Sequence, residues 1–243
     1  MKPELSIVIA AYNEEANIVP LYELIREMLE ETKIIGEAIW VDDGSTDGTA
    51  DAVKTLAELD SRVRYIGLSQ NQGQSAALLA GIQAANGHIL AFLDADLQNH
   101  PGDIPLLIAK LREGYEMVCG WRKKRKDHYI SYTLPSRVGN VLIRMLFKQQ
   151  IHDLGCGLKV CRAYTVKNLR YFRNIHRYLP IVLGYSGAKI GEVVVRHYPR
   201  IHGQSKYSFL KAFRVIRELL YLRFVYKHSP IVRPENLPLP LQP

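Results

Sequence analysis

Carboxylate side chains follow several short apolar runs in this sequence, and one group of them has the spacing of a metal site. Asp94, Ala95 and Asp96 come directly after the apolar run 88–93, and Gln98 lies two residues further along. In an extended chain the first and third side chains of a D-x-D pattern point to the same side, so both carboxylates can contact one cation. A site with few carboxylates and open positions suits Mg²⁺ or Mn²⁺ bound to a diphosphate. Because D-x-D alone is a common pattern, its meaning depends on its neighbours.

Two more polar clusters follow apolar runs of the same kind. The tripeptide 12–14 (Tyr-Asn-Glu) comes after the run 5–10, and the tetrapeptide 42–45 (Asp-Asp-Gly-Ser) comes after the run 38–41. Ligands of open α/β sheets bind at the carboxyl ends of the strands, so the pattern predicts that all three clusters converge on one edge. Ser45 or Asp47 alone is better explained as a helix cap, whereas the three clusters together favour a binding site.

Strand-length apolar runs alternate with helix-length amphipathic segments through the first half of the chain. The predicted strands are 5–10, 38–41, 62–68, 88–93 and 117–120, and the predicted helices are 14–31, 47–59, 73–86 and 101–113. Such alternation predicts βαβ units, and therefore a largely parallel α/β sheet of the Rossmann-like kind flanked by helices on both faces. A length of 243 residues with 47% hydrophobic and 23% charged residues fits one large globular domain.

Several common functions lack their sequence motifs here. The chain has no G-x-x-x-x-G-K-[ST] loop and no G-x-G-x-x-G after its first strand, which disfavours a nucleotide hydrolase, a kinase or a dinucleotide oxidoreductase. It also has no G-x-S-x-G or H-E-x-x-H motif. No secretory signal is predicted, because the N-terminal apolar run 5–11 is too short for one. No membrane-spanning run is predicted either, because the longest charge-free stretch, 65–93, is interrupted by amides. The three cysteines show no C-x-x-C pairing, which fits a reducing compartment.

The ordered motifs, taken together, resemble the family 2 glycosyltransferases of the GT-A fold. The matching segments are 11–15 (AYNEE), 41–47 (VDDGSTD), 94–98 (DADLQ), 120–122 (GWR), 152–157 (HDLGCG) and 192–207. Within that family, the DADLQ form followed by Pro101 is similar to dolichol-phosphate mannose synthases and their bacterial polyprenyl-phosphate relatives. One departure is Ala10, where the family usually has proline. The resemblance covers about residues 5 to 210, and the ordered combination is more specific than any single motif.

The resemblance implies a role for each matching residue. The residues expected to bind the nucleotide sugar are Ala10, Tyr12, Glu14, Val41, Asp43, Asp94, Ala95, Asp96, Arg200 and Lys206. The expected metal ligands are Asp94, Asp96 and Gln98, with Mg²⁺ or Mn²⁺ as the cofactor. Arg122 and Arg137 are expected to bind an acceptor phosphate, since guanidinium forms paired hydrogen bonds with phosphate. The predicted catalytic group comprises Asp96, Arg122, Arg137, Asp153 and Arg200.

The charge is distributed unevenly along the chain. Residues 1–116 have a net charge of −11 and residues 117–243 a net charge of +19, which gives the total of +8. The basic run 122–126 lacks interleaved aromatic residues and no nucleic-acid-binding motif occurs elsewhere, so no nucleic-acid partner is predicted. An anionic lipid acceptor and an anionic membrane surface explain the basic half better.

Two segments have the pattern of amphipathic helices lying on a membrane surface. Segments 135–148 and 207–227 place apolar residues at helical spacing among basic ones, although such stripes also pack on a protein's own core. The predicted organisation is a nucleotide-sugar-binding half (1–116), an acceptor-binding half of the same domain (117–206), a C-terminal amphipathic interfacial helix (207–228) and a proline-rich tail (229–243). The predicted location is the cytoplasmic face of a membrane, as a peripheral protein, and an integral membrane partner is left open.

These observations lead to one functional hypothesis and its alternatives. The hypothesis is an inverting, metal-dependent transfer of a hexose to dolichyl or undecaprenyl phosphate, with mannose from GDP-mannose as the favoured donor. A phosphate acceptor is already anionic, so Asp153 would orient the acceptor-binding arginines. The alternatives are a UDP-glucose-dependent polyprenyl-phosphate glucosyltransferase, and a transferase that adds sugar to a hydroxyl in polysaccharide synthesis with Asp153 as its base. The non-enzyme alternative is a basic, nucleotide-dependent module that binds membranes or nucleic acid.

Overall fold

The computed structural model describes residues 2–123, 151–167, 169 and 174–199. The described strands are β1 (Leu5–Ala11), β2 (Gly36–Asp42), β3 (Val63–Gly67), β4 (Ile89–Asp94), β5 (Met117–Trp121), β6 (Lys159–Arg162) and β7 (Ile190–Val194). The described helices are α1 (Glu15–Thr32), α2 (Thr49–Leu59), α3 (Gln74–Ala84), α4 (Ile104–Arg112) and α6 (Ile175–Tyr185), with short 3₁₀ turns η1 (Pro101–Asp103) and η3 (Ala163–Thr165). The predicted helices 135–148 and 207–227 and the tail 229–243 lie outside the described residues.

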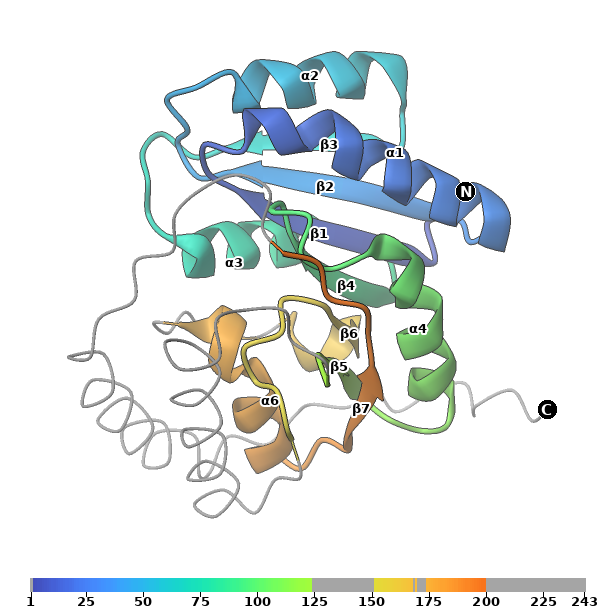
Figure 1. Cartoon of the computed structure of the whole chain (residues 1–243). Helices are drawn as coiled ribbons and strands as arrows, with labels where there is room; N and C mark the ends of the chain where they lie inside the picture. The colour runs from blue at the N-terminus through green and yellow to red at the C-terminus, as the bar shows by residue number, and fades with distance from the viewer. Residues whose placement is uncertain (1, 124–150, 168, 170–173, 200–243) are drawn as a thin grey trace.

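The described strands form one mixed sheet in the order β3-β2-β1-β4-β6-β5-β7 (Figure 1). Neighbouring strands are parallel except at β6, which is antiparallel to both β4 and β5. In the centre of the sheet Ala10 is in register with Val41 on one side and with Asp94 on the other. The carboxyl ends of β1, β2 and β4 therefore meet at one edge, as the sequence pattern predicted.

The alternation of strands and helices predicted for residues 5–121 is confirmed. The antiparallel strand β6, the helix α6 and the edge strand β7 were not predicted. Strand β6 has four residues, too few to show a hydrophobic period, and it includes the buried Lys159. These three elements complete the half of the sheet that lies beyond β4.

Helices cover both faces of the sheet, and each face has its own apolar core (Figure 1). One core packs α3 and α6 against residues such as Val8, Val41 and Leu90, and the other packs α1, α2 and α4 against residues such as Ile7, Trp40 and Val160. Successive strand residues alternate between the two cores because side chains of a strand point to opposite faces. Strands buried on both faces, such as β2, have the continuous apolar runs seen in the sequence.

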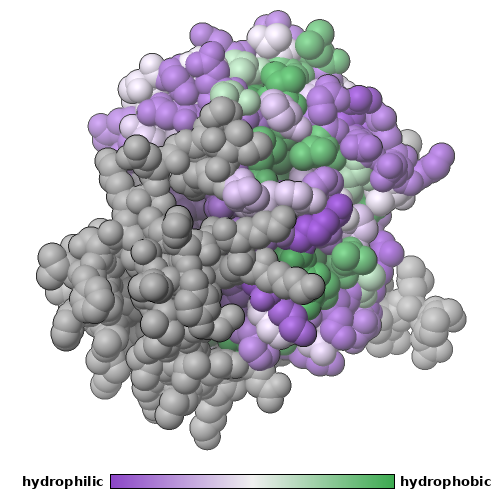
Figure 2. Space-filling model, in the orientation of Figure 1, coloured by the Kyte–Doolittle hydropathy of each residue, from purple (hydrophilic) through white to green (hydrophobic). Residues whose placement is uncertain are grey.

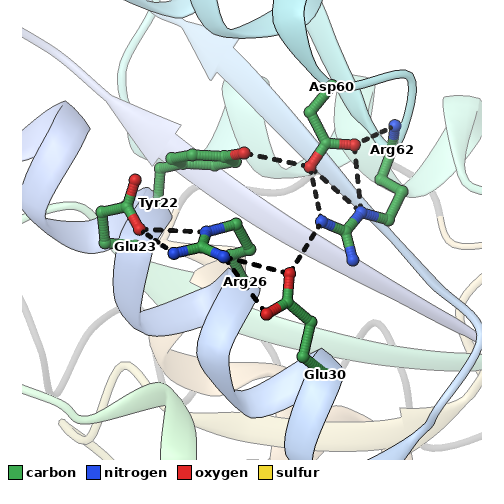
Figure 3. A network of polar contacts seen from close by, with 6 residues as sticks. All are labelled: Tyr22, Glu23, Arg26, Glu30, Asp60 and Arg62. Atoms are coloured by element: carbon green, nitrogen blue, oxygen red, sulfur yellow. Dashed lines mark hydrogen bonds and ion pairs between the residues drawn. The ribbon is translucent and has the colours of Figure 1, made fainter.

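A surface network holds α1 against the turn that precedes β3 (Figure 3). The Tyr22 hydroxyl donates to Asp60 at 3.1 Å, and Arg62 Nη2 lies 2.7 Å from the same carboxylate. Hydrogen bonds from Arg62 lower the pKa of Asp60 in spite of its partial burial. Arg26 and Glu30 extend the network along α1. These groups support the fold and do not line the cavity described below.

On the face drawn in Figure 2, hydrophilic side chains cover most of the described surface, with apolar side chains between them. Large apolar residues that remain exposed include Leu59, Leu106, Val19 and Val194. Single exposed apolar residues are common on folded proteins. Among the described residues, no helix is both long and apolar enough to cross a membrane.

Candidate active site

A cavity of about 200 Å³ lies at the carboxyl edge of β1, β2 and β4. Its lining consists of Ala10, Ala11, Tyr12, Glu14, Asp43, Gln74, Asp94, Ala95 and Asp96. The residues come from the ends of three parallel strands and from the start of α3. The three polar clusters of the sequence therefore converge on one space.

The loops after β1 and β2 are joined by hydrogen bonds to each other. The Asn13 backbone N–H donates to Ser45 Oγ at 2.9 Å, and the Thr46 N–H donates to Asn13 Oδ1 at 2.8 Å. Asn13 has φ of 55°, a left-handed conformation that asparagine tolerates better than most residues. Asp47 accepts N–H groups from the first residues of two helices, Glu15 and Thr49. Asp47 thus binds the starts of α1 and α2, whereas Ser45 joins the two loops and is not the N-cap of either helix. Tyr12 and Glu14 line the cavity.

Asp43 combines a place in the cavity wall with a structural contact. Its two carboxylate oxygens accept the backbone N–H groups of Gln72 and Gly73, each at 2.8 Å. The next residue, Gly44, has φ of 69°, and a Cβ there would lie 2.5 Å from the backbone of Gln70. Glycine is therefore required where this turn packs on the segment that starts α3.

Asp94 and Asp96 are held at the cavity by different contacts. Gln74 Nε2 donates to Asp94 Oδ1 at 2.7 Å, and the backbone N–H of Gln98 donates to Asp96 Oδ1 at 3.1 Å. Leu97, which lies between Asp96 and Gln98, has φ of 59°, which is unusual for a residue with a large side chain, and this side chain packs on the core beside α4. A tight, strained turn thus directs both carboxylates to the same cavity.

The segment 153–157 passes directly against Asp94. A Cβ at Gly157 would lie 2.6 Å from Asp94 Cγ and closer still to its Oδ2. Glycine at this position allows the backbone to approach the carboxylate, which a side chain would prevent. The H-D-L-G-C-G motif therefore packs against a residue of the cavity wall, although it is separated from Asp94 by more than fifty residues of sequence.

The same segment binds Arg122 through Asp153. Arg122 Nε and Nη2 lie 2.7 and 3.0 Å from the two carboxylate oxygens of Asp153, and the Arg122 backbone N–H also donates to this carboxylate. Both side chains are buried, with 7% and 5% of their surface exposed. Paired, charge-assisted hydrogen bonds of this kind set the plane of a guanidinium group.

Glu192 and its contacts were not assigned a role from the sequence. Glu192 Oε1 accepts the backbone N–H groups of His152 and Asp153 at 2.8 and 3.2 Å, and Oε2 lies 2.7 Å from His152 Nδ1. The His152 ring stacks on Trp121, with centroids 4.4 Å apart. The signal available in the sequence was only that Glu192 belongs to a matching segment, because its partners lie about 40 positions earlier.

The structure brings together part of the predicted site. Seven predicted nucleotide-sugar residues line the cavity: Ala10, Tyr12, Glu14, Asp43, Asp94, Ala95 and Asp96. Val41 does not line it, because its side chain is fully buried in the core under α3. Gln98 is also not part of the lining, and its backbone bonds to Asp96 and to Tyr198. Arg137, Arg200 and Lys206 lie outside the described residues.

The oxygen ligands at the cavity fit a hard divalent cation whose remaining coordination positions are filled by substrate or water. Asp94 and Asp96 supply two carboxylates, and no group of three or more His, Cys, Asp or Glu side chains with metal-ligand geometry occurs among the described residues. Mg²⁺ and Mn²⁺ sites that also bind a diphosphate are typically made of one or two carboxylates, with substrate oxygens and water as the other ligands. A closed, all-protein cage is not needed for that role.

The three cysteines are buried free thiols. Cys119, Cys156 and Cys161 are all fully buried, which raises the pKa of Cys156 to about 11 and that of Cys161 to about 12. High-pKa buried thiols are poor nucleophiles.

The architecture and the cavity define the class of protein. A largely parallel sheet with helices on both faces, and with its acidic residues at the carboxyl edge, is the GT-A arrangement of sugar-nucleotide transferases. Solved structures of glucosyl-3-phosphoglycerate synthase from Mycobacterium tuberculosis share this fold. One complex with phosphoglyceric acid has a TM-score of 0.70 and 22% identity, over 90% of this chain and 80% of that one. A second, crystallised with Mn²⁺, UDP and glucosyl-3-phosphoglycerate, has a TM-score of 0.69 and 19% identity, over 94% of this chain and 81% of that one.

The chain belongs to glycosyl transferase family 2, whose model matches residues 6–170. A dodecaprenyl-phosphate galacturonate synthase of Rhizobium johnstonii is 39% identical over 230 residues, which is 93% of this chain and 68% of the relative. An undecaprenyl-phosphate 4-deoxy-4-formamido-L-arabinose transferase of Proteus mirabilis is 34% identical over 89% of this chain and 67% of its own length. The chain thus spans about two thirds of these relatives. The predicted family and GT-A fold are confirmed, and the non-enzyme alternative is disfavoured.

Proposed function

We propose that this protein transfers a sugar from a nucleoside diphosphate sugar to a polyprenyl phosphate, with inversion at the anomeric carbon. The observation that supports this most directly is the position of the segment 153–157. At one end Asp153 binds Arg122, and at the other Gly157 lies against Asp94. One short segment therefore links a guanidinium suited to phosphate with the carboxylates suited to a donor diphosphate.

The donor side is proposed to use the residues of the cavity. Tyr12, which is 45% exposed, offers an aromatic face to a nucleobase, and Glu14 and Asp43 lie beside it. Asp94 and Asp96 would hold Mg²⁺ or Mn²⁺. A divalent cation at these carboxylates would offset the negative charge that develops on the leaving diphosphate. Arg200 and Lys206 remain proposed phosphate ligands.

The acceptor side is proposed to centre on Arg122, with Arg137 as a second cation. A phosphate oxygen of the acceptor forms the new bond to the anomeric carbon, while the bond to the nucleoside diphosphate breaks and its electron pair leaves with that diphosphate. No proton has to be removed, because the acceptor phosphate is already ionised near neutral pH. Asp153 is buried and uses both oxygens to bind Arg122. This arrangement suits a positioning role better than that of a base for a hydroxyl acceptor.

The identity of the sugar is a finer part of the proposal. The motif resemblance favoured mannose from GDP-mannose, but the relatives described above carry galacturonate and 4-deoxy-4-formamido-L-arabinose in their names. We propose galacturonate as the first sugar to test, because it belongs to the relative with 39% identity over 93% of this chain. The polyprenyl phosphate named for both relatives supports a lipid acceptor and therefore action at a membrane surface. The peripheral location on the cytoplasmic face stays a prediction.

A donor panel tests this function. The purified chain is incubated with Mn²⁺ or Mg²⁺, undecaprenyl phosphate and one radiolabelled donor at a time: UDP-galacturonate, UDP-4-deoxy-4-formamido-L-arabinose, UDP-glucose or GDP-mannose. Metal-dependent label in the lipid fraction is the expected result for one donor, and chelation should abolish it. If every donor fails with every polyprenyl phosphate, the proposal is wrong. Transfer to a sugar hydroxyl in place of the lipid would support the polysaccharide alternative.

A further inference from the structure

We propose that Glu192 is a positioning residue that sets the orientation of Arg122 from both sides. Glu192 lies on β7, which is parallel to β5, and it is in register with Cys119, three residues before Arg122. Only 10% of its side chain is exposed. The inference rests on the proposed role of Arg122 in binding an acceptor phosphate.

Glu192 influences Arg122 first through hydrogen bonds to the backbone. Glu192 Oε1 accepts the N–H groups of His152 and Asp153, which fixes the start of the segment 153–157. Asp153 then binds Arg122 Nε and Nη2 with its two oxygens. A shift of the backbone at Asp153 would therefore rotate or release the guanidinium group.

Glu192 also influences Arg122 through the imidazole ring of His152. Glu192 Oε2 lies 2.7 Å from His152 Nδ1, and the His152 ring stacks on Trp121 with an interplanar angle of 18°. Trp121 directly precedes Arg122 in the chain. Glu192 therefore acts on Arg122 by two routes. The histidine that it binds stacks on Trp121, the residue before Arg122. Its backbone contact holds Asp153, whose carboxylate binds Arg122.

The Glu192 carboxylate is largely buried and accepts two backbone N–H groups, and a neutral side chain can replace it only in part. An amide at position 192 can still accept N–H groups through its oxygen, but it has one acceptor atom where the carboxylate has two and it carries no charge. An alanine removes this acceptor from both N–H groups, and the loss is costly at Asp153, which is buried. Comparing Glu192→Gln with Glu192→Ala therefore separates the loss of the backbone hydrogen bonds from the loss of charge.

Glu116, which directly precedes β5, offers a matched control because it contacts the chain just before β7. Its carboxylate is also buried, accepts the N–H of Lys189 just before β7 at 3.0 Å, and accepts the Tyr164 hydroxyl at 2.9 Å. Glu116→Ala removes a buried carboxylate that holds the start of β7, at the opposite end of the β5–β7 pairing from Trp121 and Arg122.

The first experiment measures kinetics. We expect Glu192→Ala to raise the KM for undecaprenyl phosphate by about tenfold or more, while the KM for the donor changes less than about twofold. Glu192→Gln should recover most of that loss, and Glu116→Ala should leave both KM values near wild type even where it lowers the melting temperature. Equal effects of Glu192→Ala on donor and acceptor KM, or none on either, would overturn the proposal.

The second experiment needs no turnover and uses the Trp121 fluorescence of a Trp40→Phe background, since the chain has two tryptophans. Farnesyl phosphate, a short soluble polyprenyl phosphate, is titrated, and acrylamide quenching is measured separately. Glu192→Ala should weaken farnesyl phosphate binding and expose Trp121 to acrylamide, whereas Glu116→Ala should do neither. If wild type binds no farnesyl phosphate, the proposed acceptor is in question, and acrylamide still tests Glu192. Unchanged quenching in Glu192→Ala would refute its positioning role.

Discussion

Gly157 lies so close to the Asp94 carboxylate that no side chain can occupy position 157 without moving it: a Cβ there would stand 2.6 Å from Asp94 Cγ. The Asp94 side chain is short and has little freedom to move away, and Gln74 Nε2 also donates to its Oδ1 at 2.7 Å. Two motifs that are far apart in sequence are therefore parts of one site. Each depends sterically on the other.

Gly157→Ala should weaken donor binding by about tenfold or more, equivalent to about 1.4 kcal/mol, because the displaced Asp94 can no longer act together with Asp96. Calorimetric titration of UDP in the presence of Mn²⁺ measures the effect. Gly155→Ala is the matched comparison in the same segment, since its Cβ would lie 3.3 Å from Arg122 Nη2 instead. It should affect the acceptor more than the donor. Wild-type UDP affinity in Gly157→Ala would contradict the steric argument.

Asp96→Ala should abolish the metal-dependent part of donor binding. A direct ligand is expected to matter more than an outer partner, whose loss typically costs about 10- to 100-fold in metal affinity. The affinity for UDP with and without Mn²⁺ is the measurement. Asp60→Asn serves as the control, because Asp60 bonds to Tyr22 and Arg62 away from the cavity and should change stability alone. An Asp96→Ala protein whose UDP affinity still rises with Mn²⁺ would rule out the proposed metal role.

Arg122→Ala should lower transfer to a polyprenyl phosphate far more than Asp153→Asn does. Removing the arginine takes away the proposed phosphate ligand, whereas an asparagine at 153 retains one acceptor for the guanidinium. Because the pair is buried, Arg122→Ala should also reduce the free energy of unfolding by about 3–5 kcal/mol, so the melting temperature must be measured beside the kinetics. Arg122→Lys keeps the charge and should still lose acceptor affinity.

The opposite ranking would change the reaction assigned to the site. If Asp153→Asn abolished turnover while nucleotide binding stayed intact, a base would be required and a hydroxyl acceptor would be favoured. The comparison therefore separates the two enzyme hypotheses with two variants at one ion pair.

His176 should make stability depend on pH in the mildly acidic range. Burial, together with the positive charges of Lys159 and Arg177, lowers the pKa of His176 to about 4, and its Nδ1 lies 3.1 Å from Ser75 Oγ on α3. The folded pKa is below the unfolded value of about 6.5, so the unfolded chain binds the extra proton and stability is lost as pH falls from about 6.5 to 4. The loss from this residue should approach about 3 kcal/mol.

Denaturant unfolding at pH 7, 5.5 and 4.5 checks this dependence against His176→Asn, which can keep a hydrogen bond to Ser75 and does not titrate. The variant should lose less stability than wild type across that range. Parallel pH curves for the two proteins would show that His176 is not the responsible group.

Local patterns were enough to predict one part of the molecule. The alternation of apolar runs and amphipathic segments over residues 5–121 gave the correct parallel arrangement, because each strand and helix is specified by its own period. The convergence of Tyr12, Asp43 and Asp94 on one edge followed directly, since parallel strands place their carboxyl ends together. The separate role of Asp47 at helix starts was also readable locally.

Only the tertiary structure decided how the second half completes the site. Strand β6 enters antiparallel between β4 and β5, and in doing so it carries Gly157 to Asp94 and Asp153 to Arg122. Strand β7 then brings Glu192 to the same segment. The motif resemblance predicted that Val41 binds the nucleotide. Its side chain lies in the core instead, because successive side chains of β2 alternate between the two faces of the sheet. These contacts depend on steric fit and buried charge between residues 31 to 63 positions apart, and no local period of the sequence encodes such pairings.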